Sequence, residues 1–222
     1  MEKSLYLAGV GGQGLQVAGK AIVEAAMSLG CNVTYSPKYG PAKRGGLTSC
    51  YLVISDEEIG NPRKKRHDIM LVMEPMAYAQ FRDDVKDGGL LLVNSSLVHD
   101  QDPPGGDFHR LDVPMYDVCY ELQNTKVISS VVLGVLAALL TDVFPDSSLL
   151  LNQMLDKLRS KASLVELNRS AFEKGFALTN KATILIACLR LYAGQSRVSA
   201  YCQPSVPYSA TLSALIMKVS MG

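Results

Sequence analysis

The segment Leu5–Gly14 constrains the fold of this chain more than any other part of its sequence. An apolar run leads directly into four glycines within six residues, namely Gly9, Gly11, Gly12 and Gly14. A helical pattern then extends from Gln13 to about Leu29. This order predicts a strand that ends at the edge of a sheet, then a tight turn, then a buried helix.

The glycine spacing has two interpretations. Glycine at positions 9, 11 and 14 matches the G-x-G-x-x-G pattern, in which the missing side chains let a ligand approach the backbone. The N-terminus of the following helix presents unpaired N–H groups and a partial positive charge, which favour an anion. A turn that only has to be tight needs the same residues, so the pattern alone leaves a phosphate site and a structural turn open.

The segments that follow predict an α/β fold. Cys31–Tyr35 is a short β-rich run, so strand, helix and strand form a unit of about thirty residues, which is typical of a parallel crossover. Buried strands are expected at Asp68–Met73 and Leu90–Asn94, with a helix between them from Glu74 to about Val85. We expect a three-layer sandwich with a mainly parallel, Rossmann-like central sheet and helices on both faces.

The C-terminal part of the chain is expected to be helical. Helices are predicted at Ser129–Val143, Asp146–Ser160 and Ser163–Asn180. We expect a single α/β domain over residues 1–180 and a helical C-terminal extension over residues 181–222. No run of about eighteen apolar residues occurs in the chain, so no membrane span is expected.

Charge and cysteine content argue against several classes of protein. The formal net charge is +1 and the pI is about 7.6, so a nucleic-acid-binding role is not expected. The cysteines are scattered and form no Cys-x-x-Cys pair, which argues against a zinc or iron–sulfur site. Reduced cysteines are typical of a cytoplasmic protein, which is the location we expect. The histidines also lie in separate segments, and we assign no catalytic residue and no metal ligand.

The second predicted strand argues against a bound NAD. Dinucleotide folds place Asp or Glu about twenty residues beyond the glycines, where it holds the ribose hydroxyls. Here the segment Val33–Lys38 contains no carboxylate, and Pro37 is an unusual continuation of the strand. A nicotinamide-dependent dehydrogenase is therefore disfavoured.

A cationic loop, Pro37–Gly46, follows this strand. It contains three cations and three glycines, and two prolines stiffen it. A solvated connection between strands is one interpretation. In a parallel sheet, however, the loop would leave the same carboxyl edge as the glycine turn, so two elements that favour anions would share one crevice.

Together these motifs resemble the γ subunit of 2-oxoacid:ferredoxin oxidoreductases. The matching segments are Gly9–Gly14, Pro37–Gly46, Thr48–Ser55 and Asn168–Phe176. The resemblance covers residues 1–178. Within it, Arg44–Cys50 is most similar to the 2-oxoglutarate branch, because pyruvate-type relatives differ at the start of that strand.

The resemblance implies a division of labour among subunits. In this family the α and β subunits and a ferredoxin-like δ subunit carry thiamine diphosphate and iron–sulfur clusters. The complex converts a 2-oxoacid and coenzyme A to acyl-CoA and carbon dioxide, and passes the electrons to ferredoxin. This chain lacks the motifs for either cofactor, so alone it would bind none and would not be active. Its expected roles are to serve the coenzyme A side of the complex and subunit assembly.

The candidate cofactor-binding residues lie in the glycine turn and the cationic loop. They are Gly9, Gly11, Gly12, Gln13, Gly14, Lys38, Tyr39, Gly40, Lys43, Arg44, Gly45 and Gly46. They would hold the phosphates of coenzyme A or contact the catalytic subunits, and the sequence leaves both open. The alternative function is a stand-alone nucleotide- or CoA-binding α/β protein.

Overall fold

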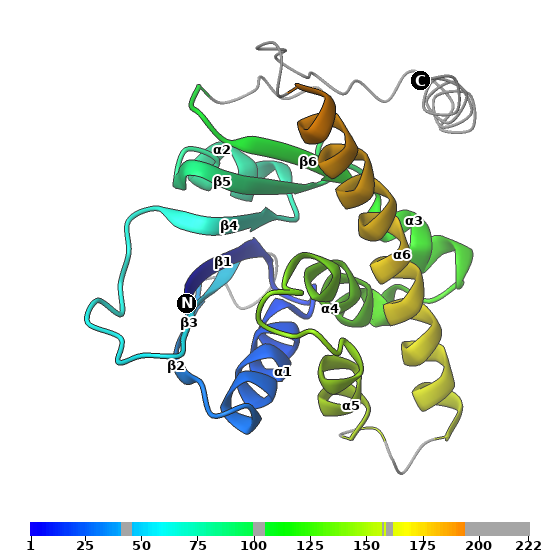
Figure 1. The fold of residues 1–222 in the computed structure, drawn as a ribbon. Coiled ribbons are helices and arrows are strands. Elements are labelled where there is room, and N and C mark those ends of the chain that lie inside the picture. Colours follow the sequence, from blue (N-terminus) through cyan, green and yellow to red (C-terminus); the bar gives the residue numbers. More distant parts are fainter. Residues whose placement is uncertain (41–45, 100–104, 157, 159–161, 194–222) are drawn as a thin grey trace. The chain divides into compact units, whose positions relative to one another are not determined.

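The computed structural model of this chain describes residues 1–40, 46–99, 105–156, 158 and 162–193 (Figure 1). The chain divides into two compact units, residues 1–184 and residues 185–222. The central sheet and the helices that cover it belong to the first unit. Among the described residues, no helix is both long and apolar enough to cross a membrane.

The elements follow one another along the chain in an alternating α/β order. The strands are β1 (Glu2–Val10), β2 (Asn32–Tyr39), β3 (Leu47–Ser55), β4 (His67–Val72), β5 (Val85–Asn94) and β6 (His109–Val113). The helices are α1 (Leu15–Ser28), α2 (Pro75–Phe81), α3 (Met115–Glu121), the 3-10 helix η1 (Thr125–Val127), α4 (Ile128–Leu139), α5 (Ser148–Asp156) and α6 (Ala162–Ala193).

The six-stranded sheet has the order β2-β3-β1-β4-β5-β6. Strands β1, β4, β5 and β6 are mutually parallel, whereas β3 lies antiparallel between β1 and β2. The predicted α/β class with a mainly parallel sheet is therefore confirmed. Strand β2 runs in the same direction as β1 but does not pair with it, because β3 lies between them.

Alternate residues of the strands pack against helices on opposite faces of the sheet. On one face, Leu7 and Cys50 are fully buried beside α1, and the Cys50 Sγ lies 3.6 Å from the Leu15 carbonyl oxygen. On the other face, Tyr6 and Met70 belong to a cluster that includes Ala77 of α2. Helices α1, α4 and α5 contact one another, and α1 also contacts β2 and β3 on the first face. Helix α2 contacts β1 and β4 on the other face, so helices cover both faces as predicted (Figure 1).

Helices α4 and α6 cross at two glycines. A methyl group added at Gly134 of α4 would collide with the backbone of Phe172, and one added at Gly175 of α6 would collide with the backbone of Val131. Ser130 is fully buried at this crossing, where its hydroxyl donates a 2.6 Å hydrogen bond to Asn168 Oδ1. The predicted helix of residues 163–180 is thus held against the domain by direct backbone contact.

Several elements differ from the sequence prediction, three of them in ways that matter for the fold. The segment before Val113 forms a sixth strand, β6, which pairs with β5, whereas the sequence pattern indicated no strand there. Helix α2 ends at Phe81, four residues before the predicted end at Val85, which instead begins β5. The predicted helices before and after residue 180 form one continuous helix, α6.

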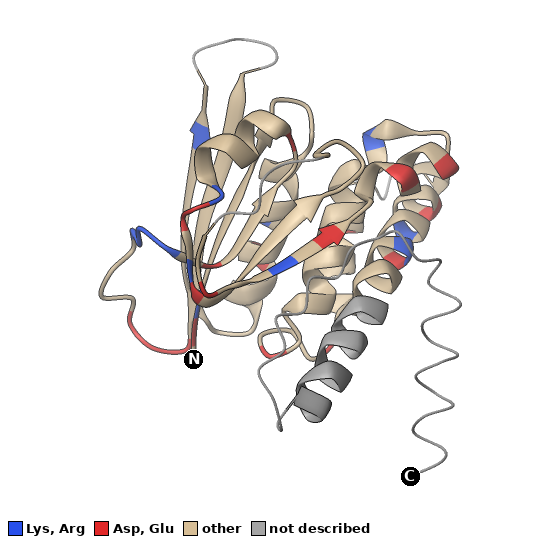
Figure 2. Ribbon diagram, turned by 90° about the horizontal axis from the view of Figure 1, so that it is seen from above, with Lys and Arg blue, Asp and Glu red and all other residues tan. Residues whose placement is uncertain are grey.

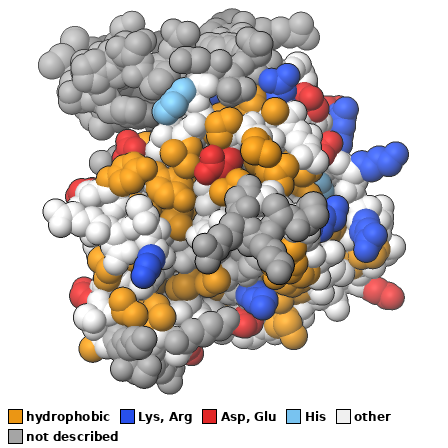
Figure 3. All heavy atoms as spheres, turned by 180° about the vertical axis from the view of Figure 1, so that it is seen from behind, with side chains coloured by type: hydrophobic (Ala, Val, Ile, Leu, Met, Phe, Trp, Pro, Cys, Tyr) orange, Lys and Arg blue, Asp and Glu red, His pale blue; other side chains and the backbone are white. Residues whose placement is uncertain are grey.

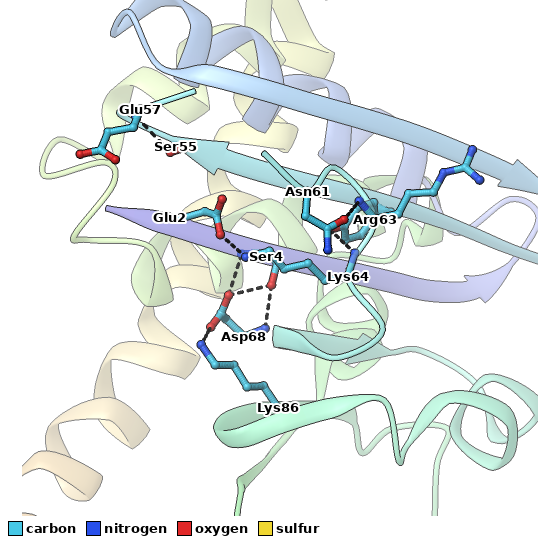
Figure 4. Close-up of polar contacts among 10 residues, drawn as sticks. Glu2, Ser4, Ser55, Glu57, Asn61, Arg63, Lys64, Asp68 and Lys86 are labelled. Carbon is cyan, nitrogen blue, oxygen red and sulfur yellow. Dashed lines mark hydrogen bonds and ion pairs between the residues drawn. The ribbon is translucent and has the colours of Figure 1, made fainter. Parts of the chain in front are cut away.

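A buried polar contact joins the amino ends of β1 and β4 (Figure 4). Asp68 Oδ2 accepts hydrogen bonds from the Ser4 hydroxyl at 2.7 Å and from the Ser4 N–H at 2.9 Å. The Lys86 ammonium lies 3.0 Å from the other oxygen of Asp68. Burial alone would raise the pKa of Asp68, but these hydrogen bonds outweigh it and hold the pKa below its usual value.

We predict that Asp68→Asn lowers the free energy of unfolding by about 2 kcal/mol at neutral pH, because the contacts from Ser4 and Lys86 lose the negative charge that strengthens them. The pKa of Asp68 is lower in the folded state, so its contribution is present above the unfolded value of about 3.9. That contribution is lost as the pH falls through the folded pKa. Urea denaturation at a series of pH values should show the two proteins converging in acid.

Asp83→Asn is the matched control for this experiment, because the Asp83 side chain is 71% exposed. It should change stability little at any pH. A difference between wild type and Asp68→Asn that persists unchanged below the folded pKa would contradict the assignment.

Candidate functional site

The glycine turn connects the end of β1 at Val10 to the start of α1 at Leu15. Gly12 and Gly14 adopt left-handed backbone conformations, with φ of 101° and 69°. Such angles strain any residue with a side chain, so the conformation of the turn favours glycine at both positions.

The four glycines of the turn have different neighbours. A Cβ at Gly9 would collide with the Gln13 side chain, and a Cβ at Gly14 would lie 2.5 Å from the Ser129 Cβ of α4. By contrast, a Cβ at Gly11 or Gly12 would meet no atom of the described residues within 4 Å. Gly9 and Gly14 therefore permit close packing, whereas Gly11 and Gly12 are exposed and leave the backbone open to an incoming group.

Gln13 is almost completely buried, with 3% of its surface exposed. Its Oε1 accepts a 2.9 Å hydrogen bond from the Val10 N–H, and its Nε2 donates a 2.5 Å hydrogen bond to Glu74 Oε1. Burial raises the pKa of the Tyr116 hydroxyl, and a hydrogen bond with Gln13 offsets part of that rise. Gln13 thus supports the turn from within.

Glu74 follows the end of β4 and precedes α2, which begins at Pro75. It is half-buried, and burial raises the pKa of its carboxyl group above the usual value, while the hydrogen bond from Gln13 offsets part of the rise. Sequence reasoning treated this residue only as the start of a helix. Its pairing with a glutamine 61 positions earlier depends on the order of the strands, which the sequence pattern did not give.

The β2–β3 loop begins at the same edge of the sheet as the glycine turn. Tyr39 of β2 and Gly9 of β1 both pair with Thr48 of β3, which lies between them. The Gly11 N–H donates a 3.2 Å hydrogen bond to the Gly46 carbonyl oxygen. A Cβ at Gly40 would lie 2.5 Å from the Leu47 carbonyl oxygen, so this glycine permits a close backbone approach. The structure therefore brings the two sequence motifs together.

The cations of this loop have different positions relative to the turn. The Lys38 ammonium lies 5.9 Å from the centre of the Tyr6 ring of β1. Lys43, Arg44 and Gly45 lie outside the described residues. Tyr39 is 71% exposed at the end of β2.

Gln16 is a residue that the sequence analysis did not single out. Its Nε2 donates a 2.7 Å hydrogen bond to the Ser49 carbonyl oxygen of β3, and its Oε1 accepts a 2.5 Å hydrogen bond from the Tyr35 hydroxyl of β2. The first turn of α1 is thereby tied to both strands that flank the cationic loop. A glutamine in an amphipathic helix carries no local signal of such a role.

Asn94, at the end of β5, is fully buried and has a structural role. It donates a 3.2 Å hydrogen bond to the Met73 carbonyl oxygen and accepts one of 3.1 Å from the Met115 N–H. The Ser96 hydroxyl accepts hydrogen bonds from N–H groups at the start of α3. These polar residues therefore cap the start of α3, which follows β6.

The cation run Arg63–Arg66 lies in the loop between β3 and β4, which also carries acidic residues 56–58 (Figure 2). Lys64 pairs with Glu2, and Arg66 Nη1 lies 3.0 Å from Asp87 Oδ1. This loop leaves β3 at the end of the sheet opposite to the glycine turn. Within the part of the chain that the structure describes, no group of His, Cys, Asp and Glu side chains could hold a metal ion.

The model of the pyruvate ferredoxin/flavodoxin oxidoreductase family matches residues 4–178. The chain belongs to this family. The match confirms the resemblance that the glycine turn and the cationic loop indicated. A 2-oxoglutarate synthase subunit, KorC, from Methanocaldococcus jannaschii is 32% identical over 184 residues, which is 82% of this chain and 96% of that protein.

Solved structures of similar fold include members of the same family. The γ subunit of a keto/oxoacid ferredoxin oxidoreductase from Geobacter sulfurreducens is 31% identical, with a TM-score of 0.68, covering 81% of this chain and 97% of that one. A 2-oxoglutarate:ferredoxin oxidoreductase from Magnetococcus marinus, solved with 2-oxoglutarate, coenzyme A and succinyl-CoA bound, has a TM-score of 0.74 at 22% identity. The match covers 81% of this chain and 31% of that longer one. One curated relative is also longer, and the matched region spans 28% of it.

The relatives from Methanocaldococcus jannaschii and Geobacter sulfurreducens are named as subunits of oxidoreductases, and this chain shares their family. The mixed, mostly parallel sheet with flanking helices is the fold of these γ subunits.

We predict that Gly14→Ala lowers the free energy of unfolding by about 3 kcal/mol, because it combines left-handed strain with a collision against Ser129. Gly11→Ala should change stability by less than about 0.5 kcal/mol, since its Cβ would meet open space. Urea denaturation of the two variants would test the division between packing and open glycines. Equal losses in both would refute it.

Proposed function

We propose that this chain is the γ subunit of a complex that converts a 2-oxoacid and coenzyme A to acyl-CoA and carbon dioxide, with electrons passed to ferredoxin. We favour 2-oxoglutarate as the oxoacid. The match along nearly the whole length of a 2-oxoglutarate synthase subunit supports this choice, as does the 2-oxoglutarate-like sequence of residues 44–50. The alternative of a stand-alone nucleotide- or CoA-binding protein gains no support from the relatives named above.

We infer that coenzyme A meets this chain at the glycine turn. The observation that carries this inference is the open backbone of Gly11 and Gly12 at the carboxyl edge of a parallel sheet. Helix α1 leaves β1 toward one face and α2 leaves β4 toward the other, so the turn lies at the topological switch point, where α/β folds bind ligands. The remaining candidates, including Lys43, Arg44 and Gly45, stay predictions from the sequence.

The α, β and ferredoxin-like δ subunits would supply thiamine diphosphate and the iron–sulfur clusters. Exposed apolar side chains near the same edge fit an interface with such partners, since Tyr39, Met76 and Val17 are 71%, 59% and 44% exposed. Figure 3 shows hydrophobic side chains gathered across one face of the molecule. We also propose a cytoplasmic location, consistent with the free cysteines Cys31, Cys50 and Cys119.

Calorimetric titration with coenzyme A, of the chain alone and of the assembled oxidoreductase, tests the proposal. Gly11→Val should weaken binding at least about tenfold, because the side chain would fill the space that the ligand needs. Acyl-CoA formation at limiting coenzyme A should fall in parallel, while the melting temperature stays near that of wild type.

Gly60→Val is the matched control, since Gly60 is also open but lies in the β3–β4 loop, away from the turn. Unchanged coenzyme A affinity in Gly11→Val would show that the glycine turn of this chain does not contact coenzyme A. Oxidation of 2-oxoacids by the isolated chain with NAD alone would overturn the subunit assignment itself.

A further inference from the structure

The carboxylate that the sequence lacks after β2 is present after β4. Strand β4, not β2, is the parallel neighbour of β1, because β3 separates β1 from β2. The first residue after β4, Met73, donates a 2.9 Å hydrogen bond from its N–H to the Ala8 carbonyl oxygen of β1. Glu74 therefore emerges beside the glycine turn, at the position where a parallel neighbour places a ligand-binding side chain.

The contacts of Glu74 leave it able to accept further hydrogen bonds. Glu74 Oε1 accepts one from Gln13 Nε2, while a carboxylate has roughly four acceptor positions in all. Gln13 itself is buried and also engaged with Val10, so it has little capacity left for a ligand. Glu74 is half-buried, which leaves part of its surface accessible at this edge.

Among the described residues, the charge beside the turn is unfavourable for a phosphate group. The N-terminus of α1 supplies a partial positive charge. The Glu74 carboxylate, however, carries a full negative charge and accepts a hydrogen bond from Gln13 of the turn. The Lys38 ammonium lies over the Tyr6 ring, and the pKa of Glu74 is raised by burial with no cation among the causes of the shift. A neutral group that donates hydrogen bonds fits these surroundings better than an anion.

We propose that Glu74 is a ligand-binding residue that accepts a hydrogen bond from the pantetheine arm of coenzyme A. This inference rests on the proposed function of the glycine turn as the coenzyme A site. The pantetheine arm carries amide N–H and hydroxyl donors but no charge, whereas the phosphates of coenzyme A lie on its nucleotide half. The arm, and not the diphosphate, then lies against the open backbone of Gly11 and Gly12.

The test is calorimetric titration of the assembled oxidoreductase with coenzyme A, pantetheine and adenosine 3′,5′-diphosphate. Glu74→Gln keeps an oxygen acceptor for Gln13 but removes the charge, so the fold and melting temperature should be retained. Its affinity for coenzyme A and for pantetheine should each fall roughly tenfold, because a charge-assisted hydrogen bond is weakened. Its affinity for adenosine 3′,5′-diphosphate should stay the same. Asp117→Asn, which neutralises an exposed carboxylate in the first turn of α3, should leave all three unchanged.

The outcomes separate this inference from the proposed function. If wild type does not bind coenzyme A, the proposed function itself fails. If wild type binds coenzyme A but Glu74→Gln binds pantetheine equally well, Glu74 is not a ligand-binding residue. If Glu74→Gln binds coenzyme A more tightly and pantetheine unchanged, Glu74 repels a phosphate at the turn, which overturns the proposed orientation. Glu74→Ala, which also removes the acceptor for Gln13, should lose at least as much affinity as Glu74→Gln.

Discussion

The pairing of β1 on both of its edges is the constraint on which the rest of this structure depends. Nine residues of β1 pair with β3 in the antiparallel direction, and the same strand pairs with β4 in the parallel direction. The backbone of β1 is thus hydrogen-bonded along both edges, and helices on the two faces leave Leu5, Leu7 and Ala8 completely buried. The contact of Ser4 with Asp68 fixes the register at one end of the strand, and the Met73–Ala8 hydrogen bond fixes it near the other.

The glycine turn is therefore held by its surroundings as much as by its own sequence. Ser129 of α4 packs on Gly14, Glu74 holds Gln13 from the side of β4, and Gly46 accepts a hydrogen bond from Gly11. Each of these contacts comes from a different element, so the open backbone at Gly11 and Gly12 is preorganised for whatever approaches it. Preorganisation of this kind reduces the entropy that a ligand or partner subunit must lose on binding.

Charge at the two ends of the sheet is distributed unequally. The loop between β3 and β4 carries basic and acidic residues at the end opposite to the glycine turn, and several of them pair with each other or with neighbouring strands. Beside the turn, Glu74 is the charged group that the structure shows hydrogen-bonded to a turn residue. As far as the described residues go, this polarity supports the proposed ligand with neutral donor groups, and exposed apolar side chains such as Tyr39 and Met76 suit a partner chain.

The sequence by itself determined the local elements and the family. Four glycines after an apolar run specify a strand, a turn and a helix, because the left-handed angles at Gly12 and Gly14 strain any other residue. The two motifs together identified the family, and the α/β class followed from the spacing of strands and helices. Strand β6 escaped prediction because it is short and follows a polar loop, so its formation depends on the edge that β5 offers.

Only the tertiary structure decided which residues meet at the carboxyl edge. Sequence reasoning looked for a carboxylate after β2, because that strand is usually the neighbour of the first, and found none. The insertion of β3 makes β4 the parallel neighbour instead, and this brings Glu74 to Gln13 across 61 residues. The same order of strands places the Lys38 ammonium over the Tyr6 ring. Strand order arises from long-range pairing and burial, which leave no local pattern in the sequence.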